Sequence, residues 1–252
     1  MTAVTPAERI LLGLGIRHPN EIDLEAVAAS RNAFVRYKPL DKCEAMIVGS
    51  KKGIILVNSH SREERQRFSL AHEVGHWHHH CGQVLYCGPV DVGNPAPGPL
   101  NPERQADEFA SDLILPNYMF RPILAKVARV RLQEMREIAA EFRASLTATL
   151  IKMVEANQFP VVLACLDRHG LRWSKRADMV PGWWKLQRTL DPDTFAGRML
   201  FQGASEEAWP RAMPADAWFE FRGAGEYEVK EQSFLLPNDQ VLTVLALPGN
   251  AF

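Results

Sequence analysis

The sequence predicts an α+β protein: a mostly helical N-terminal region with a small antiparallel sheet, followed by a small C-terminal α/β region. Three observations support this prediction. Short strand-like runs occupy roughly residues 34–58, helical patterns dominate from about 61 to 156, and strand-like runs return from about Phe159. The 252 residues suffice for one large domain or two small ones, and 46% of them are apolar, so a substantial core can form.

Composition argues against several classes of protein. The formal net charge of -1 gives no global electrostatic case for binding nucleic acid or an anionic membrane. The N-terminal stretch lacks the features of a signal peptide, and no apolar run approaches the ~20 residues that cross a bilayer. The four cysteines contain no CxxC pair, which favours reduced thiols. We therefore expect a cytoplasmic protein that makes no membrane contact.

The first elements are two short helices and three strands. Helices are expected at about Thr5–Gly15, where Pro6 stands at an early helical position, and at about Asp23–Arg31. The runs FVRYKPL, EAMIVGS and GIILVNS follow, rich in β-branched and aromatic residues and separated by turn residues. This pattern predicts a small antiparallel sheet over residues 34–58.

A long helix is expected next, followed by a loop. Ser61 and Glu64 have the spacing of a capping box, which predicts that the helix begins there and runs to about His79. Residues 82–101 are dense in glycine and proline and predict a loop.

A second strong helix begins after this loop. Asn101 is suited to the N-cap, Pro102 to the first helical position, and the pattern ends at Pro116. Residues 132–156 then predict two helices joined by a tight turn, and a boundary is expected near residue 158.

The first long helix carries a spacing typical of metal sites, His72-Glu73-x-x-His76. Positions i and i+4 share one face of a helix, so the two imidazoles can bind one zinc ion. Glu73 lies beside them, where its carboxylate can take a proton from water whose pKa zinc lowers to about 7. A catalytic zinc has three protein ligands and one open position, so a third ligand must come from elsewhere.

Three sources compete for the third ligand. His80 shares the helix face, but the helical rise places it ~12 Å from His72 along the axis. A thiolate of Cys81 or Cys87 would bind zinc, although thiolates suit closed structural sites better than hydrolytic ones. The third source, which we prefer, is Glu103 in the first turn of the following helix.

Glu103 and Asp107 lie at one end of a helix face that is otherwise apolar. The apolar positions of that face are Ala106, Ala110 and Ile114. Asp107 is expected to accept a hydrogen bond from the far nitrogen of a ligand histidine and so to fix its tautomer. The run His78–His80 is expected to be a solvated helix end, where cationic character favours the helix dipole.

Two sequence blocks together resemble the ImmA/IrrE metallopeptidases. The block RQRFSLAHEVGH is similar to the family pattern R-x-R-F-[ST]-L-A-H-E-[LIV]-G-H. The block ERQADEFASDLILP is similar to E-x-x-A-[ND]-x-F-A-x-x-L-[LI]-[ML]-P, with Leu115 where the family usually has methionine. The resemblance covers about residues 20–157, and two separated motifs agree in order and spacing.

The resemblance implies a zinc-dependent endopeptidase with a zincin-like fold. It implies zinc, with manganese as an alternative, on His72, His76 and Glu103, and Glu73 as the general base. It also implies a protein substrate, since family members cleave helix-turn-helix transcriptional repressors, or trigger their cleavage. That cleavage induces stress, DNA-damage or mobile-element genes. The radiation-response members carry a C-terminal GAF-like domain.

We therefore predict three parts: a zincin-like metallopeptidase domain at 1–130, a helix-turn-helix-like segment at 131–158, and a C-terminal α/β domain at 159–252. The last is expected to be a sensor or partner-binding domain, GAF-like if it follows the radiation-response members. Its five tryptophans could line a ligand pocket, but a core role is preferred. They are Trp173, Trp183, Trp184, Trp209 and Trp218.

The helix pair at 132–156 leaves an alternative function open. Its second helix offers Thr147, Thr149 and Lys152 to DNA, and the turn offers Arg143, which are few cations for phosphate contacts. A helical hairpin that recognises a protein is therefore preferred. The alternative to proteolysis is a regulator that binds a repressor, or DNA, without cutting. Tyr118 is a further candidate, as a stabiliser of the oxyanion, although an ordinary half-buried tyrosine is preferred.

Overall fold

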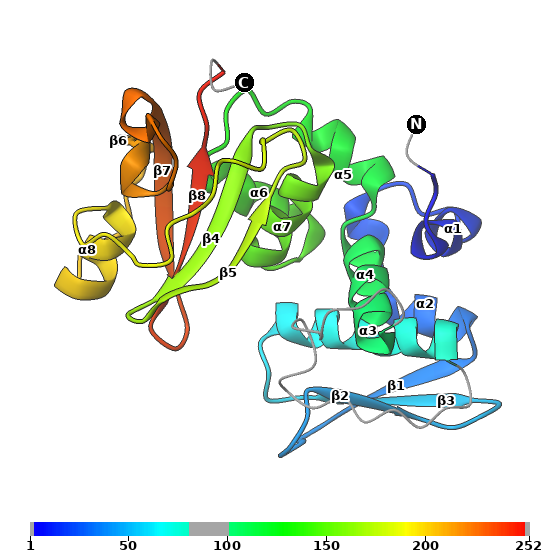
Figure 1. The fold of residues 1–252 in the computed structure, drawn as a ribbon. Coiled ribbons are helices and arrows are strands. Elements are labelled where there is room, and N and C mark those ends of the chain that lie inside the picture. The colour runs from blue at the N-terminus through cyan, green and yellow to red at the C-terminus, as the bar shows by residue number, and fades with distance from the viewer. Residues whose placement is uncertain (1–2, 81–100, 250–252) are drawn as a thin grey trace. The chain divides into compact units, whose positions relative to one another are not determined.

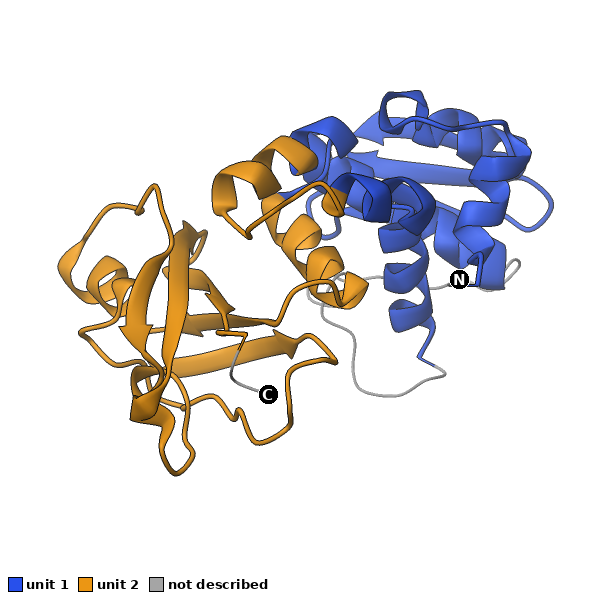
Figure 2. Ribbon diagram, turned by 90° about the horizontal axis from the view of Figure 1, so that it is seen from above, with its two compact units in different colours: residues 1–123, 139–145 blue, residues 124–138, 146–252 orange. Residues whose placement is uncertain are grey.

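The computed structural model describes residues 3–80 and 101–249 and contains two compact units (Figures 1 and 2). Unit 1 comprises Met1–Ile123 with Ala139–Ser145, and unit 2 comprises Leu124–Ile138 with Leu146–Phe252. No helix within the described ranges is long and apolar enough to span a bilayer. The division into three parts at residues 130 and 158 stays a prediction.

Unit 1 begins with the two expected short helices. In α1, Pro6–Gly13, the Thr5 side chain accepts a hydrogen bond from the Glu8 amide. The Glu8 carboxylate accepts one from the Thr5 amide, which completes a capping box. In α2, Leu24–Ser30, the Asp23 side chain accepts from the first-turn amides. A short 3₁₀ helix, Pro19–Glu21, lies between them.

The sheet of unit 1 is mixed, so the prediction of an antiparallel sheet is wrong. Its strands are β1 (Ala33–Lys38), β2 (Ala45–Val48) and β3 (Gly53–Asn58), in the order β1-β3-β2. The pair β2–β3 is antiparallel, but β1 runs parallel to β3. The physical reason is that β2 and β3 are consecutive and pair as an antiparallel hairpin, which occupies one side of β3. Arg36 and Lys38 suit β1 to the remaining edge, and there β1 runs in the same direction as β3.

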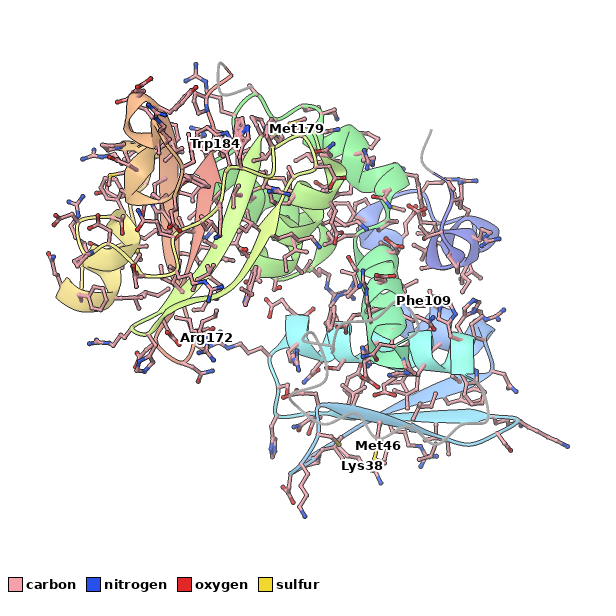
Figure 3. All side chains as sticks on the ribbon, viewed as in Figure 1. Lys38, Met46, Phe109, Arg172, Met179 and Trp184 are labelled. Atoms are coloured by element: carbon pink, nitrogen blue, oxygen red, sulfur yellow. The ribbon has the colours of Figure 1, made fainter. Side chains whose placement is uncertain are left out.

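Helix α3, Glu63–His80, covers one face of this sheet (Figure 1). Figure 3 shows that Met46 points from β2 to the opposite side of the sheet. The predicted capping box at Ser61 does not form. Its hydroxyl donates instead to the Glu44 carboxylate, at 2.5 Å, and the helix begins two residues later.

Helices α4 (Pro102–Ile114) and α5 (Asn117–Leu124) complete most of unit 1. The Asn101 side chain accepts from the Glu103 amide at 2.9 Å, as expected of an N-cap followed by proline. Helix α4 packs closely on α3 at Gly75. A Cβ atom there would lie 3.1 Å from Ala106 Cα and 3.2 Å from Phe109 Cβ.

Unit 2 is built on a five-stranded sheet in the order β5-β4-β8-β7-β6, in which every neighbouring pair is antiparallel. The sequence predicts that the C-terminal region is α/β. Because its sheet is antiparallel, it is an α+β arrangement instead. The strands are β4 (Val161–Asp167), β5 (Gly170–Arg176), β6 (Arg211–Pro214), β7 (Glu228–Leu236) and β8 (Gln240–Ala246). The helices of this part are α6 (Leu132–Phe142, which contributes to both units), α7 (Leu146–Ala156), α8 (Phe195–Gln202) and two 3₁₀ turns at Ala215–Ala217 and Ala224–Glu226.

The five tryptophans of unit 2 differ in burial, and the two buried ones support the expected core role. Trp184 is buried and forms edge contacts with the rings of Phe219 and Tyr227. Trp218 is also buried, and its indole donates to a buried carboxylate. Trp209 is 61% exposed. A cavity beside α8 measures only about 40 Å³, which is room for little more than water.

The helix pair α6–α7 offers little to DNA. Thr149 and Lys152, two of the side chains expected on a recognition helix, are buried. Arg143, in the turn between the helices, pairs with the Glu63 carboxylate. These observations leave the helical hairpin as the better description of this segment.

Glu8 links two distant helix starts within unit 1. It is only 3% exposed, and its Oε2 accepts from the Thr5 amide at 2.9 Å. Its Oε1 accepts from the amides of Asn117 at 2.6 Å and Tyr118 at 3.3 Å, the first residues of α5. One buried carboxylate thus satisfies unpaired donors of both α1 and α5.

We expect Glu8→Ala to lower the free energy of unfolding by about 2–3 kcal/mol, because it leaves buried amide donors without an acceptor. Glu64→Ala is the matched control, since Glu64 is an exposed acid in the first turn of α3, and its carboxylate caps no second helix among the described residues. Urea unfolding followed by circular dichroism measures both. Equal unfolding midpoints for the two variants would contradict the proposed role of Glu8.

Candidate metal centre

Three side chains converge where α3 and α4 meet. The Nε2 atoms of His72 and His76 lie 2.9 Å apart. The Glu103 carboxylate places one oxygen 3.2 Å from His72 Nε2 and the other 3.4 Å from His76 Nε2. Both histidines are buried, while the Glu103 side chain is 19% exposed and so borders solvent.

The chemistry and spacing of this group fit one small cation. All the converging atoms can offer a lone pair, and one ligand atom from each residue lies within 4.8 Å of the others. A tetrahedral zinc with bonds of about 2.0–2.1 Å separates neighbouring ligand atoms by about 3.3–3.4 Å. The observed separations of 2.9, 3.2 and 3.4 Å are close to that spacing. Two imidazoles and one carboxylate also leave one position open.

Asp107 orients the first imidazole from the opposite side. Its Oδ1 lies 2.9 Å from His72 Nδ1, so a proton on Nδ1 leaves the Nε2 lone pair directed at the other two residues. Burial lowers the pKa of His72, but the hydrogen bonds to Asp107 and Glu103 outweigh it and raise the pKa to about 9. The carboxylates around His72 therefore create a negative electrostatic potential at its ring, which also favours the binding of a metal cation.

Glu73 is buried beside this group, and neither carboxylate oxygen has a hydrogen-bond partner of good geometry within the described residues. Burial raises the pKa of Glu73 to about 7. The charge of His72 and the backbone of Ile47 oppose the rise, and the charge of Glu103 adds to it. A carboxylate of this pKa, with free lone pairs, can both accept and return a proton near neutral pH.

Local packing explains why these residues meet. His72, Glu73 and His76 share α3, and the absence of a side chain at Gly75 lets α4 approach that helix closely. The Asn101 cap starts α4 so that Glu103 lies in its first turn, opposite the two histidines.

The histidines after His76 belong to a different environment. The His78 ring stacks on Phe109 with 5.2 Å between ring centroids, and its Nδ1 lies 3.5 Å from Arg31 Nη2. Burial lowers the pKa of His78, and the charges of His79, Arg31 and Arg9 lower it further. The expectation of a solvated, cationic helix end is therefore wrong for His78, because Phe109 and two arginines surround it.

Two further candidates from the sequence take no part in the described group. The Tyr118 hydroxyl donates to the Ile16 carbonyl oxygen at 2.9 Å, which does not support a role in stabilising an oxyanion. The competing ligands, namely the side chain of His80 and the residues Cys81 and Cys87, lie outside the described residues.

Sequence reasoning missed Cys43 and Ile47. Cys43 is a free cysteine just before β2. Burial raises the pKa of its thiol, and the carboxylates of Glu73 and Glu44 raise it further, which places Cys43 near the candidate base. No motif could have revealed this neighbour, since only the packing of α3 on the sheet brings it close.

Comparisons with known proteins agree with this geometry. The family model of the IrrE N-terminal-like domain, a peptidase family, matches residues 21–153, which include both motif helices, α6 and most of α7. No curated protein matches the sequence significantly. Among solved structures, a Mycobacterium tuberculosis transcriptional regulator is similar, with a TM-score of 0.64 and 12% identity. The match covers 96% of this chain and 75% of that one.

At 12% identity the structural match shows a similar fold alone. The family match is stronger evidence, because it spans more than half of the chain and contains His72, His76 and Glu103. The resemblance predicted from two sequence blocks is confirmed: this chain belongs to the ImmA/IrrE family, the metallopeptidases with an IrrE N-terminal-like domain.

Proposed function

We propose that this chain is a zinc-dependent endopeptidase that cleaves a helix-turn-helix transcriptional repressor. The observation that supports it best is the convergence of His72, His76 and Glu103 beside a buried carboxylate, Glu73, whose oxygens have no hydrogen-bond partner of good geometry among the described residues. A purely structural zinc site would instead have four protein ligands and no neighbouring base.

Each residue has a distinct role in this proposal. Bound by His72, His76 and Glu103, zinc supplies Lewis acidity toward a carbonyl oxygen and toward water. Glu73 removes a proton from the attacking water, so that its oxygen bonds to the carbonyl carbon of the peptide. Glu73 then returns the proton to the amide nitrogen as the C–N bond breaks. Asp107 holds the His72 ring in the tautomer that directs Nε2 at the metal.

The metal and the substrate are proposed on different grounds. Two imidazoles with one carboxylate suit zinc, and manganese remains the alternative because it too accepts imidazole and carboxylate ligands. The repressor substrate rests on the family, whose members act on such repressors. The response that cleavage would induce, to stress, to DNA damage or in a mobile element, and a cytoplasmic location follow from that substrate. A sensor or partner-binding role for the C-terminal region is proposed on the same basis.

We expect the wild-type chain to bind about one zinc ion, and Glu103→Ala or His72→Ala to weaken zinc binding by more than about 100-fold. Asp107→Ala should weaken it by about 10–100-fold, because it supports a ligand without binding the metal. Competition with a chromogenic zinc chelator measures all three. Glu108→Ala is the control, an exposed acid on the same helix. Undiminished zinc affinity in Glu103→Ala would refute the third ligand.

Gly75→Ala should weaken zinc binding by roughly tenfold, because a Cβ 3.1 Å from Ala106 Cα forces α4 and its Glu103 outward by a few tenths of an ångström. A change of glycine to alanine inside a helix usually stabilises that helix by about 0.5–1 kcal/mol, so a loss of zinc affinity would not come from a weaker α3. Gly13→Ala is the control, since its Cβ would meet nothing within 4 Å. Unchanged zinc affinity in Gly75→Ala, measured by the same competition, would show that the close contact does not set the site.

Glu73→Gln should keep the zinc ion but slow repressor cleavage by about 10²–10⁴-fold, because the amide cannot accept the proton. The substrate is a purified helix-turn-helix repressor encoded beside the gene for this chain, and mass spectrometry identifies the cut products. Glu64→Gln, an exposed position on the same helix, should cleave at the wild-type rate. Full cleavage by Glu73→Gln would eliminate Glu73 as the base.

The same assay separates proteolysis from sequestration. A regulator that only binds its repressor would form the complex with or without metal and give no cut product in the wild type. That result would refute the peptidase proposal.

A further inference from the structure

Unit 1 has an open groove of about 550 Å³ that the proposed peptidase chemistry does not use. It runs between α1, the end of α2 and the last turns of α3. From α1 it takes residues at helical spacing, among them Pro6, Ile10 and Gly13, so it follows most of that helix. Its volume is within the range of sites for small molecules.

Two arginines give the groove an uncompensated positive charge. Arg9 and Arg31 both line it and are exposed, and neither pairs with an acidic side chain within residues 3–80 and 101–249. The acid adjacent to Arg9 is Glu8, whose carboxylate is occupied by backbone amides. His78 adds an imidazole ring, whose Nδ1 lies 3.5 Å from Arg31 Nη2.

Apolar atoms form the rest of the wall. Leu14 is 46% exposed at the end of α1, and Ile10, one turn earlier, is half-buried. Large aliphatic side chains beside guanidinium groups that form no ion pair within the described residues present two kinds of contact at once, a bidentate site for an oxyanion and a surface for an apolar group.

We propose that this groove binds a small amphipathic anion, a phosphate or carboxylate group carried on an apolar body, with Arg9 and Arg31 holding the anion. The ligand's apolar part lies against Ile10 and Leu14. This site is independent of the metal centre, since none of its lining residues belongs to the His72–His76–Glu103 group.

The test measures the binding of hexyl phosphate and of heptanoate to the 252-residue chain by titration calorimetry. For ligands of this size we expect a Kd of about 1 mM or tighter for at least one probe. Hexyl phosphate should bind at least about tenfold more tightly than methyl phosphate, because it buries several more methylene groups. Comparing the phosphate with the carboxylate identifies the preferred anion. Vesicles of phosphatidylcholine with phosphatidic acid test whether the anion is a lipid head group.

Arg9→Gln and Arg31→Gln should each weaken hexyl phosphate by about tenfold or more. Leu14→Ser should remove most of the advantage of hexyl over methyl phosphate. Arg36→Gln makes the same change in charge outside the groove and should bind as the wild type does. The indole N–H of Trp77 donates to the Arg31 carbonyl at 2.8 Å, so its NMR signal reports binding at this place.

Two results would overturn the proposal. One is the absence of saturable binding of either probe up to about 10 mM, far above the expected range. The other is equal binding by the wild type and the two arginine variants. Glu73→Gln should bind the probes normally, so a failed peptidase proposal leaves this one intact.

Discussion

The close packing of α3 on α4 at Gly75 is the constraint on which the candidate metal centre depends. The histidines come from one helix and the carboxylate from the other, so no single element can form the group. A side chain at position 75 would meet the backbone of Ala106, and backbone cannot rotate away as a side chain can. The distance between α3 and α4 is therefore set by the missing side chain of Gly75, one position before His76.

Around this contact the polar groups have opposite requirements. Asp107 is held by a histidine and anchors it, whereas Glu73 is buried with no comparable partner. Burying a carboxylate whose oxygens make no hydrogen bond of good geometry with the described residues costs free energy that a purely structural residue would have no reason to retain. Two acids whose charges act on the same imidazole, that of His72, thus have different surroundings, and the difference matches the different roles proposed for them.

Local patterns predicted much of unit 1. The helix starts at Thr5, Asp23 and Asn101 depend on residues adjacent in sequence, and the i, i+4 spacing placed His72 and His76 on one face. Glu103 could be chosen because a capped helix fixes which of its residues share a face.

The failures have a common physical cause, which is that tertiary contacts outweigh local signals. The parallel pairing of β1 with β3 depends on which side of β3 the β2–β3 hairpin leaves open, and strand-like runs alone do not specify their neighbours. Ser61 has the spacing of a cap but finds a carboxylate 17 residues away. His78 lies against Phe109 of α4 and against Arg31, the residue that follows α2. The burial of Thr149 cannot be predicted from a helical pattern alone.

The family domain as matched begins at residue 21, yet unit 1 does not. The amides that start α5 are capped from Glu8, and Ala7 and Leu11 on the same helix are completely buried. A fragment cut at the edge of the matched domain would expose the surface under α1 and leave two backbone donors of α5 without their acceptor. The family match and unit 1 therefore begin at different residues. A minimal fragment that keeps the metal centre must retain the chain from Thr5 onward.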